Sequence, residues 1–344
     1  MSRIDQLREL LEEPFLVTTP VNVRYLTGLD SSNAAVLVDD ERAVLFTDFR
    51  YAESARKIEG VEFVEVERAL MRGVVANVSG RLGFESAHLT YASWQMLTDA
   101  GLELVPRPGY VERLRVVKSP EELDRIRRAS EIASGAYERL TQERFVGRTE
   151  RELAWAFETF MHELGAHGPS FPTTVASGEN GATPHGKTSD RVIGAGETIV
   201  VDAGAVIDGY ASDCTRTFVT GELPEELRRA YDVCLEAQLA ALEGVRAGTT
   251  GRDADSIART IIANAGFGER FGHGLGHGIG LMVHEAPTLR PESEDTLAAN
   301  HVVTVEPGIY LPGVGGVRIE DLVVVTDDAP DVLTPFTKAL TTVD

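Results

Sequence analysis

The segment Ile199 to Phe218, IVVDAGAVIDGYASDCTRTF, constrains the fold of this chain most strongly. Two apolar, β-branched runs flank an Asp-Gly dipeptide at 208–209, which tolerates the positive φ angles of a tight hairpin turn. With that turn, Asp202 faces Thr215, and the period-two alternation of strand side chains places Asp202 and Asp213 on one face as diagonal neighbours. No Lys or Arg shares that face. A single Asp near a turn is usually a solvated cap. The pair therefore indicates a functional site only if a second such arrangement exists.

A second pair of acidic residues lies in a second apolar hairpin, Val302 to Val325. Glu306 and Glu320 flank its Gly- and Pro-rich turn and differ by an even number, so regular pairing would point both to one face. The register across this longer turn stays open. Between the two hairpins lies FGHGLGHGIGLMVHE, in which glycines on both sides of His277 leave its imidazole unobstructed.

The C-terminal part of the chain reads as two copies of one plan. The letters PEEL occur at 120–123 and again at 224–227, an offset of 104 residues, and adding 104 to Asp202 gives Glu306. Capping signals and apolar periodicity predict two helices before each hairpin, at about 120–143, 149–165, 224–246 and 253–265. We therefore expect a duplicated helix-helix-hairpin unit with a carboxylate at matching places in both copies.

The first part of the chain has a different rhythm, in which short apolar runs alternate with helical segments up to about residue 115. This pattern predicts a small α/β domain. A boundary near 111–118 gives two domains, 1–115 and 116–344, and an α+β chain overall.

Composition excludes several classes of partner. The 344 residues include 33 Lys and Arg against 54 Asp and Glu, a formal charge of −21, which argues against nucleic acid and anionic membranes. No run of about 18 apolar residues exists, and the first 24 residues lack the apolar centre of a secretory signal. We expect a cytoplasmic protein, in which Cys214 and Cys234 are small buried residues.

Four carboxylates and one imidazole on a rigid sheet indicate a metal centre. Mostly oxygen donors with one nitrogen suit Mn, Co, Zn or Fe better than a thiolate site or an all-oxygen calcium site would. Four negative ligands balance two dications, whereas one ion would leave a net charge of −2 in the pocket. Two neighbouring ions can share a water, lower its pKa and stabilise an oxyanion, which predicts hydrolysis.

These residues lie in motifs that resemble the successive signatures of the pita-bread metallopeptidases, the family of methionine aminopeptidase, aminopeptidase P and prolidase. The resemblance covers about Val116 to Asp327, and SGENGATPHG and VRIED are similar to the proline-specific branch of the family. The first domain resembles, more loosely, the creatinase-like domain of that branch. The matching segments are VVDAGAVIDGYASDCTRTF, HGLGHGIGLMVHE, TVEPGIY, GGVRIED, NVRYLTG and TDFRYAESA.

The resemblance implies a pita-bread domain, in which the duplicated units surround a curved antiparallel sheet, and a role for each site residue. Two divalent ions (Mn, Co or Zn) would bind Asp202, Asp213, His277, Glu306 and Glu320, with Asp213 and Glu320 bridging. Glu306 would also act as general base and then acid. His185 and His284 would donate hydrogen bonds to the scissile carbonyl, and His273 would line the proline subsite. Arg318, two residues before Glu320, would orient that ligand.

The favoured function is hydrolysis of the Xaa-Pro bond in dipeptides, since the proline amide lacks the N–H that ordinary peptidases use. A dipeptidase needs a cation for the proline carboxylate, and Arg50 of the first domain is our candidate. The alternatives are an aminopeptidase acting on longer Xaa-Pro peptides, a methionine aminopeptidase, a metal-free creatine hydrolase and a non-catalytic binding module. Two-domain relatives are commonly dimers, so we expect a homodimer.

Overall fold

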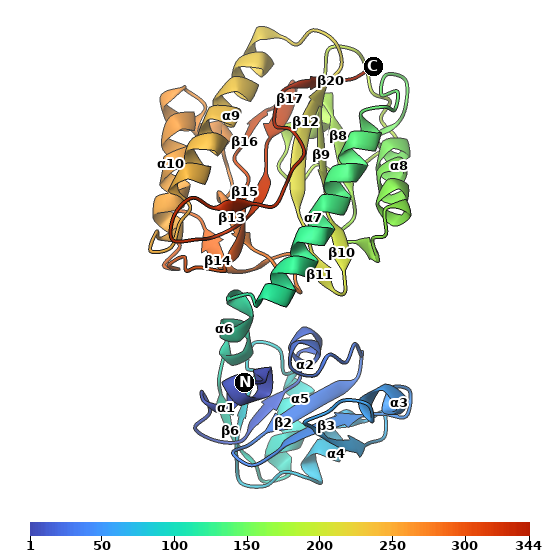
Figure 1. The fold of residues 1–344 in the computed structure, drawn as a ribbon, viewed down its shortest axis with the longest axis vertical. Coiled ribbons are helices and arrows are strands. Elements are labelled where there is room, and N and C mark those ends of the chain that lie inside the picture. Colours follow the sequence, from blue (N-terminus) through green and yellow to red (C-terminus); the bar gives the residue numbers. More distant parts are fainter. The chain divides into compact units, whose positions relative to one another are not determined.

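The computed structural model describes residues 1–344, and the chain divides into two compact units, Met1–Arg115 and Val116–Asp344 (Figure 1). Each unit has its own hydrophobic core and is described by itself. Neither contains a helix long and apolar enough to cross a membrane.

The N-terminal unit is a six-stranded mixed sheet with strand order β4-β3-β2-β1-β5-β6. Strands β1 and β5 and strands β5 and β6 run parallel, as do β3 and β4, while β2 runs antiparallel to its neighbours. The strands are β1 (Phe15–Val17), β2 (Ala34–Val38), β3 (Ala43–Thr47), β4 (Glu62–Glu65), β5 (Arg81–Phe84) and β6 (Glu103–Pro106). The helices are α1 (Arg3–Arg8), α2 (Pro20–Thr27), α3 (Ala52–Ala55), α4 (Leu70–Val75), α5 (Tyr91–Asp99) and α6 (Tyr110–Val116).

The predicted α/β rhythm of this unit is confirmed, but it contains helices that the apolar pattern did not reveal. Helix α2 begins with Pro20 at its first turn and ends at Gly28, which adopts the left-handed conformation (φ 77°). These are ordinary start and stop signals. The buried face of α2 includes the polar Asn22, and only Val74 of α4 is buried, so neither segment shows a clear apolar period.

The C-terminal unit contains the two predicted helix pairs. Ser119 with Glu122 and Thr149 with Glu152 form complete capping boxes at the start of α7 and α8. The helices are α7 (Pro120–Leu140), α8 (Glu150–Glu163), α9 (Glu225–Gly244) and α10 (Gly251–Asn264), with short 3-10 turns η1 (Gly178–Ala182) and η2 (Gly268–Arg270). Helices α7 and α9 end two to three residues earlier than expected, because their last turns unwind into the following loops.

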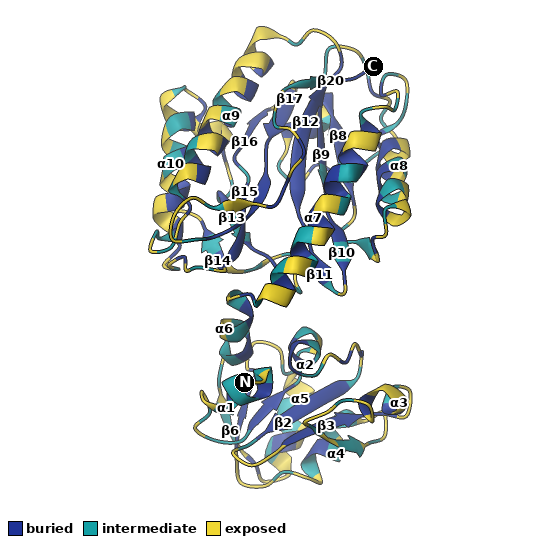
Figure 2. Cartoon of the chain, viewed as in Figure 1, coloured by how far each residue is buried: buried dark blue, intermediate teal, exposed yellow.

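Each helix pair covers one hairpin, which confirms the duplicated plan and the α+β class. One core packs α7 and α8 on the first hairpin, and another packs α9 and α10 on the second (Figure 1, Figure 2). The strands are β7 (Gly168–Pro169), β8 (Thr174–Ser177), β9 (Thr198–Ala203), β10 (Ala205–Ile207), β11 (Tyr210–Ala211), β12 (Cys214–Val219), β13 (Gly276–Gly278), β14 (Glu285–Leu289), β15 (Val302–Val305), β16 (Gly308–Leu311), β17 (Gly315–Arg318), β18 (Asp321–Val324), β19 (Asp331–Val332) and β20 (Thr341–Thr342).

The first hairpin has the predicted register. Asp202 pairs with Thr215, and the turn residues Asp208 and Gly209 have φ angles of 49° and 86°. Both hairpins are nevertheless interrupted, a feature that regular pairing did not predict. Asp213 lies in the gap between β11 and β12, and in the second hairpin pairing stops between Val305 with Asp321 and Gly308 with Arg318.

These interruptions position the acidic side chains. Glu306 follows β15 and Glu320 precedes β18, so both lie where the ladder of the second hairpin is broken. An irregular stretch bends a strand and re-aims its side chains. Gly204, at the corresponding break of the first hairpin, has no room for a side chain, since an added Cβ would lie 1.8 Å from the Ser212 carbonyl oxygen.

Candidate active site

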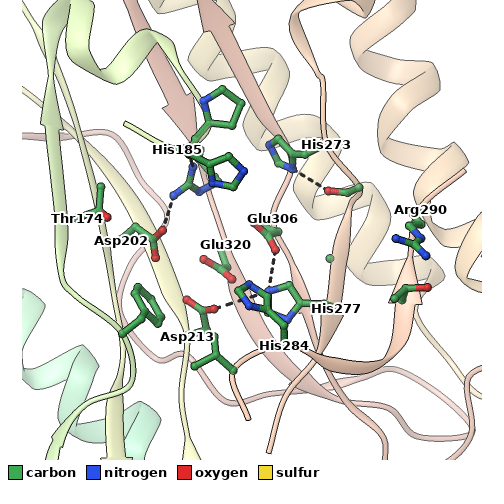
Figure 3. Close-up of a pocket in the computed structure, with 17 residues that line it drawn as sticks. Thr174, His185, Asp202, Asp213, His273, His277, His284, Arg290, Glu306 and Glu320 are labelled. Carbon is green, nitrogen blue, oxygen red and sulfur yellow. Dashed lines mark hydrogen bonds and ion pairs between the residues drawn. The ribbon is translucent and has the colours of Figure 1, made fainter. Parts of the chain in front are cut away.

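The acidic residues of the two hairpins meet in a cavity of about 510 Å³ in the C-terminal unit (Figure 3). This volume is typical of a small-molecule site. All of the site residues predicted in this unit line it, namely His185, Asp202, Asp213, His273, His277, His284, Glu306, Arg318 and Glu320. Arg50 belongs to the N-terminal unit.

Three of these side chains are close enough to hold one metal ion. One ligand atom each from Asp213, His277 and Glu320 lies within 4.8 Å of the others. The His277 Nε2 atom is also 3.2 Å from Glu306 Oε1 and 3.8 Å from Asp213 Oδ2. A carboxylate-rich centre with one imidazole nitrogen is therefore present, as the sequence predicted.

The hydrogen bond of His277 to the main chain decides which ring nitrogen faces the carboxylates. Its Nδ1 lies 3.1 Å from the Gly278 carbonyl oxygen. A carbonyl only accepts, so Nδ1 carries a proton. Although burial lowers the pKa of His277, the hydrogen bond and charge of Glu306 raise it to about 9, so without a metal ion Nε2 is also protonated and donates to Glu306. Once Nε2 loses that proton, its lone pair faces Glu306 and Asp213. This is the arrangement that fixes a histidine as a metal ligand.

Hydrogen bonds hold the carboxylates of the site in place, but some of their oxygens have no hydrogen-bond partner. Thr215 Oγ1 donates to Glu320 Oε2 at 2.7 Å, and Thr304 Oγ1 donates to Glu306 Oε1 at 3.1 Å. The other oxygens of Asp202 and Glu320, Oδ1 and Oε1, are buried and have no hydrogen-bond partner. Because buried oxygens without a partner are costly, these atoms fit the coordination of a cation.

Electrostatics support the same conclusion. Burial raises the pKa of Asp213 and of Glu320 well above their usual ranges, and repulsion from the neighbouring carboxylates adds to it. Burial and the charge of Glu306 likewise raise the pKa of Asp202, against the opposing effect of Arg318. Burial also acts to raise the pKa of Glu306, but the hydrogen bond and charge of His277 together with the charges of His273 and Arg318 outweigh it and lower that pKa to about 2. Without bound cations Asp213 and Glu320 therefore hold protons more tightly than exposed carboxyl groups do, and divalent ions would take the place of those protons.

Arg318 contacts a different carboxylate from the one predicted. Its guanidinium donates to Asp202 Oδ2 at 2.5 Å and to Thr215 Oγ1 at 3.0 Å, and Thr215 in turn donates to Glu320. Its hydrogen-bonded link to Glu320 therefore runs through Thr215, while its charge acts on Glu320 directly. Side chains that share a strand face need not touch each other, and the nearest acceptors of this long side chain lie on β9 and β12.

A chain of hydrogen bonds fixes His273. Arg318 Nη1 donates to Tyr310 Oη at 3.0 Å, and Tyr310 Oη is 3.0 Å from His273 Nε2. His273 Nδ1 is 2.8 Å from the Gly274 carbonyl oxygen, so Nδ1 holds the proton and Nε2 accepts from Tyr310. Both ring nitrogens are occupied, and the ring can serve the cavity only as an apolar wall.

His185 and His284 remain available as donors. Both are exposed to the cavity, and neither ring nitrogen has a protein partner among the hydrogen bonds of the structure. The His284 ring lies 4.3 Å from that of His277, and burial followed by the charge of His277 lowers the pKa of His284. A neutral imidazole can still donate from one nitrogen.

Sequence reasoning missed Tyr310, Thr215 and Arg290. Tyr310 and Thr215 lie within the segments TVEPGIY and DCTRTF, in which only the acidic residues were predicted to belong to the site. Arg290 lines the cavity immediately after β14, and the period-two alternation of the strand puts it on the same face as Thr288, which also lines the cavity (Figure 3). That parity was the signal available in the sequence.

Two domain models match this chain: metallopeptidase family M24 over residues 124–327 and the creatinase/prolidase N-terminal domain over residues 3–117. The first match covers more than half of the chain. The protein belongs to metallopeptidase family M24, a family that uses divalent metal ions.

Relatives with more specific names are similar over the whole length. An Xaa-Pro dipeptidase of Pyrococcus furiosus is 36% identical, and the match covers 98% of this chain and 99% of the relative. The structure of an Xaa-Pro dipeptidase from Bacillus anthracis is 40% identical with a TM-score of 0.96, covering 99% of each chain. The structure of an X-Pro aminopeptidase from Thermotoga maritima is 35% identical with a TM-score of 0.91, covering 99% of this chain and 100% of that one.

Proposed function

We propose that this protein hydrolyses the Xaa-Pro bond of dipeptides with the help of two divalent ions, Mn, Co or Zn. The observation that carries the proposal is the convergence of Asp213, His277 and Glu320, joined by Glu306 and Asp202, around unsatisfied buried oxygens. These five residues would hold the ions. When bound, such ions supply Lewis acidity, which lowers the pKa of a water and polarises a carbonyl group.

The side chains of the cavity would carry the proton transfers and the orientation of the peptide. Glu306 takes a proton from the attacking water and later gives it to the proline nitrogen as the C–N bond breaks. His185 and His284 donate hydrogen bonds to the oxygen of the scissile carbonyl. The neutral ring of His273 packs against the proline ring.

A dipeptidase must also bind the carboxylate of the proline, and the structure favours Arg290 over Arg50 for this task. Arg290 lines the catalytic cavity. Arg50 donates through Nε and Nη2 to both oxygens of buried Asp48, at 2.8 and 2.7 Å, so one edge of its guanidinium is already occupied by a carboxylate. The role of Arg50 stays a prediction.

The pair of arginines gives a sharp test. In Arg290→Gln we expect KM for Ala-Pro to rise about tenfold or more with a smaller change in kcat, since a charge-assisted hydrogen bond to the substrate is lost. Arg50→Gln is the matched variant, and the larger rise in KM identifies the clamp. Equal KM values in both variants and in the wild type would remove the clamp from this proposal.

The alternative is an aminopeptidase that cleaves after the first residue of longer Xaa-Pro peptides, supported by the similarity to the Thermotoga maritima enzyme. The two functions share their chemistry and differ in whether the substrate continues beyond the proline. Turnover of Ala-Pro against Ala-Pro-Ala decides between them, measured on chelated protein reloaded with one metal at a time. Release of Met from Met-Ala-Ser would indicate methionine aminopeptidase activity, activity that survives chelation would indicate a metal-free hydrolase, and no turnover at all would indicate a binding module.

The homodimer and the cytoplasmic location also stay predictions. Both cysteines are free and buried, which fits a reducing compartment. Sedimentation equilibrium and cell fractionation would check the two points.

A further inference from the structure

A second cavity, of about 620 Å³, continues the catalytic cavity. The two cavities share Thr174, Pro184, His185 and Asp202 in their walls. The outer part of the second cavity is formed by Trp155 and its neighbours on α8 and by the loop that follows His185, and we call it the Trp155 groove. The Trp155 groove therefore adjoins the catalytic cavity.

Trp155 lines the groove and does not belong to the hydrophobic core. It is 74% exposed, whereas Leu153 and Phe157 on the same helix are fully buried and provide its packing. An exposed aromatic side chain by itself carries little information. Here the indole borders a cavity that adjoins the catalytic cavity. Its flat apolar surface can stack on a substrate side chain.

The geometry of the catalytic cavity decides which part of the substrate faces the groove. Thr174 and Asp202 lie on one side of the acidic cluster, and His273 and Arg290 lie on the other (Figure 3). Under the function proposed above, the proline and its carboxylate occupy the side of His273 and Arg290. The residue before the proline must then lie beside Asp202, with its side chain directed past Thr174.

The charges bordering the groove are largely engaged with other protein groups. Arg151 pairs with Asp190 at 2.7 Å, and Glu158 accepts from the Thr173 amide at 3.3 Å. Among the groove residues this leaves the indole as the largest apolar surface, with exposed Lys187 at its border. The volume far exceeds what a glycine or alanine side chain would fill.

We propose that the Trp155 groove binds the side chain of the residue that precedes proline and selects large aromatic or long aliphatic side chains at that position. This inference depends on the proposed function, and it names the substrates that the site would favour: Phe-Pro and Leu-Pro over Gly-Pro and Ala-Pro.

The kinetic test compares two substrates in one variant. In Trp155→Ala we expect kcat/KM for Phe-Pro to fall about fivefold to tenfold and that for Ala-Pro to change less than twofold. Trp155→Phe should restore most of the loss. Tyr91→Ala, at an equally exposed aromatic position of the N-terminal unit, should change neither value.

A binding measurement provides a readout that does not depend on turnover. The chain has two tryptophans, Trp94 and Trp155, so Trp94→Phe makes Trp155 the sole indole reporter. The reduced-amide analogue of Phe-Pro, whose scissile carbonyl is replaced by a methylene, should change the emission of Trp155, and the Ala-Pro analogue should change it much less.

Three outcomes would overturn the proposed role of the Trp155 groove. The first is an equal loss of kcat/KM on both substrates in Trp155→Ala. The second is a preference for Glu-Pro that depends on Lys187 and not on Trp155. The third is a shift of Trp155→Ala to a smaller oligomer, which would assign the indole to a subunit interface. Failure of the wild type to cleave any Xaa-Pro dipeptide would instead reject the proposed function, so the two failures are distinguishable.

Discussion

The guanidinium of Arg318 connects more of the site than any other single group. Besides Asp202, Thr215 and Tyr310, it donates to the Pro184 carbonyl oxygen at 3.1 Å, next to His185 in the chain. This one planar guanidinium thereby positions Asp202, a candidate metal ligand. It also positions the cavity wall formed by His273 and the loop that carries His185, a candidate hydrogen-bond donor. A lysine offers one point charge in place of this planar group.

Arg318→Lys should therefore destabilise the metal-free protein by about 3 kcal/mol, because several hydrogen bonds to buried groups are lost together. Urea unfolding in the presence of a chelator measures the effect. Arg228→Lys is the matched control, since Arg228 pairs with Asp232 at 3.3 Å on an exposed helix face, where less than about 0.5 kcal/mol is expected. Similar losses in the two variants would contradict the central role of Arg318.

His301 makes stability depend on pH. Burial, followed by the charge of Lys118, lowers its pKa from 6.5 to about 4. Between these values the unfolded chain binds a proton that the folded chain does not, so stability is complete above pH 6.5 and is lost as the pH falls toward 4. The loss from this residue is at most about 3 kcal/mol.

In His301→Gln the free energy of unfolding should decline less steeply between pH 6.5 and 4 than in the wild type. Urea titrations at half-unit pH steps, with a chelator present, would show it. His88→Gln, at an exposed position, should leave the slope unchanged. A slope that His301→Gln does not alter would assign the pH dependence to the acidic cluster alone.

At the scale of elements, glycines decide how closely the strands of the site approach one another. A Cβ added to Gly276, beside His277 on β13, would lie 2.0 Å from the Thr304 carbonyl oxygen. No low-energy shift of a side chain can relieve contact with a backbone atom. The strand that carries His277 is therefore held against β15 only because residue 276 has no side chain.

Gly276→Ala should displace His277, lower the melting temperature and reduce the metal content of reloaded protein. Gly272→Ala is the control within the same segment, since a Cβ there meets no atom within 4 Å and its φ is not positive. Metal analysis and calorimetry of the two variants test the point. A Gly276→Ala protein with full metal content would show that the strand can move without disturbing the centre.

At the scale of the whole molecule, all candidate metal ligands belong to the unit Val116–Asp344, which has its own cores. We expect a fragment of residues 116–344 to unfold cooperatively and to bind as many ions per chain as the full-length protein. Calorimetry and metal analysis after reloading would check this. A fragment that folds but binds fewer ions would show that the centre needs residues 1–115.

Sequence alone was sufficient for much of the architecture. Capping boxes at Ser119 and Thr149 marked the helix starts, because a cap is a local interaction between residues three apart. The hairpin turn at 208–209 set the register of β9 and β12 for the same reason. The short helices α2 and α4 were not predicted because α2 buries the polar Asn22 and α4 buries only Val74, and their formation depends on packing.

The sequence by itself determined the kinds of chemistry that this chain carries: two acidic residues on each hairpin of a repeated plan, and one histidine between the hairpins. Only the tertiary structure decided where their atoms lie. The breaks in the two hairpins, the partners of Arg318, the tautomer of His277 and the place of Arg290 on the cavity wall all depend on contacts between residues far apart in the chain. Local patterns fix which elements form, whereas the distances within a site arise from the packing of those elements against each other.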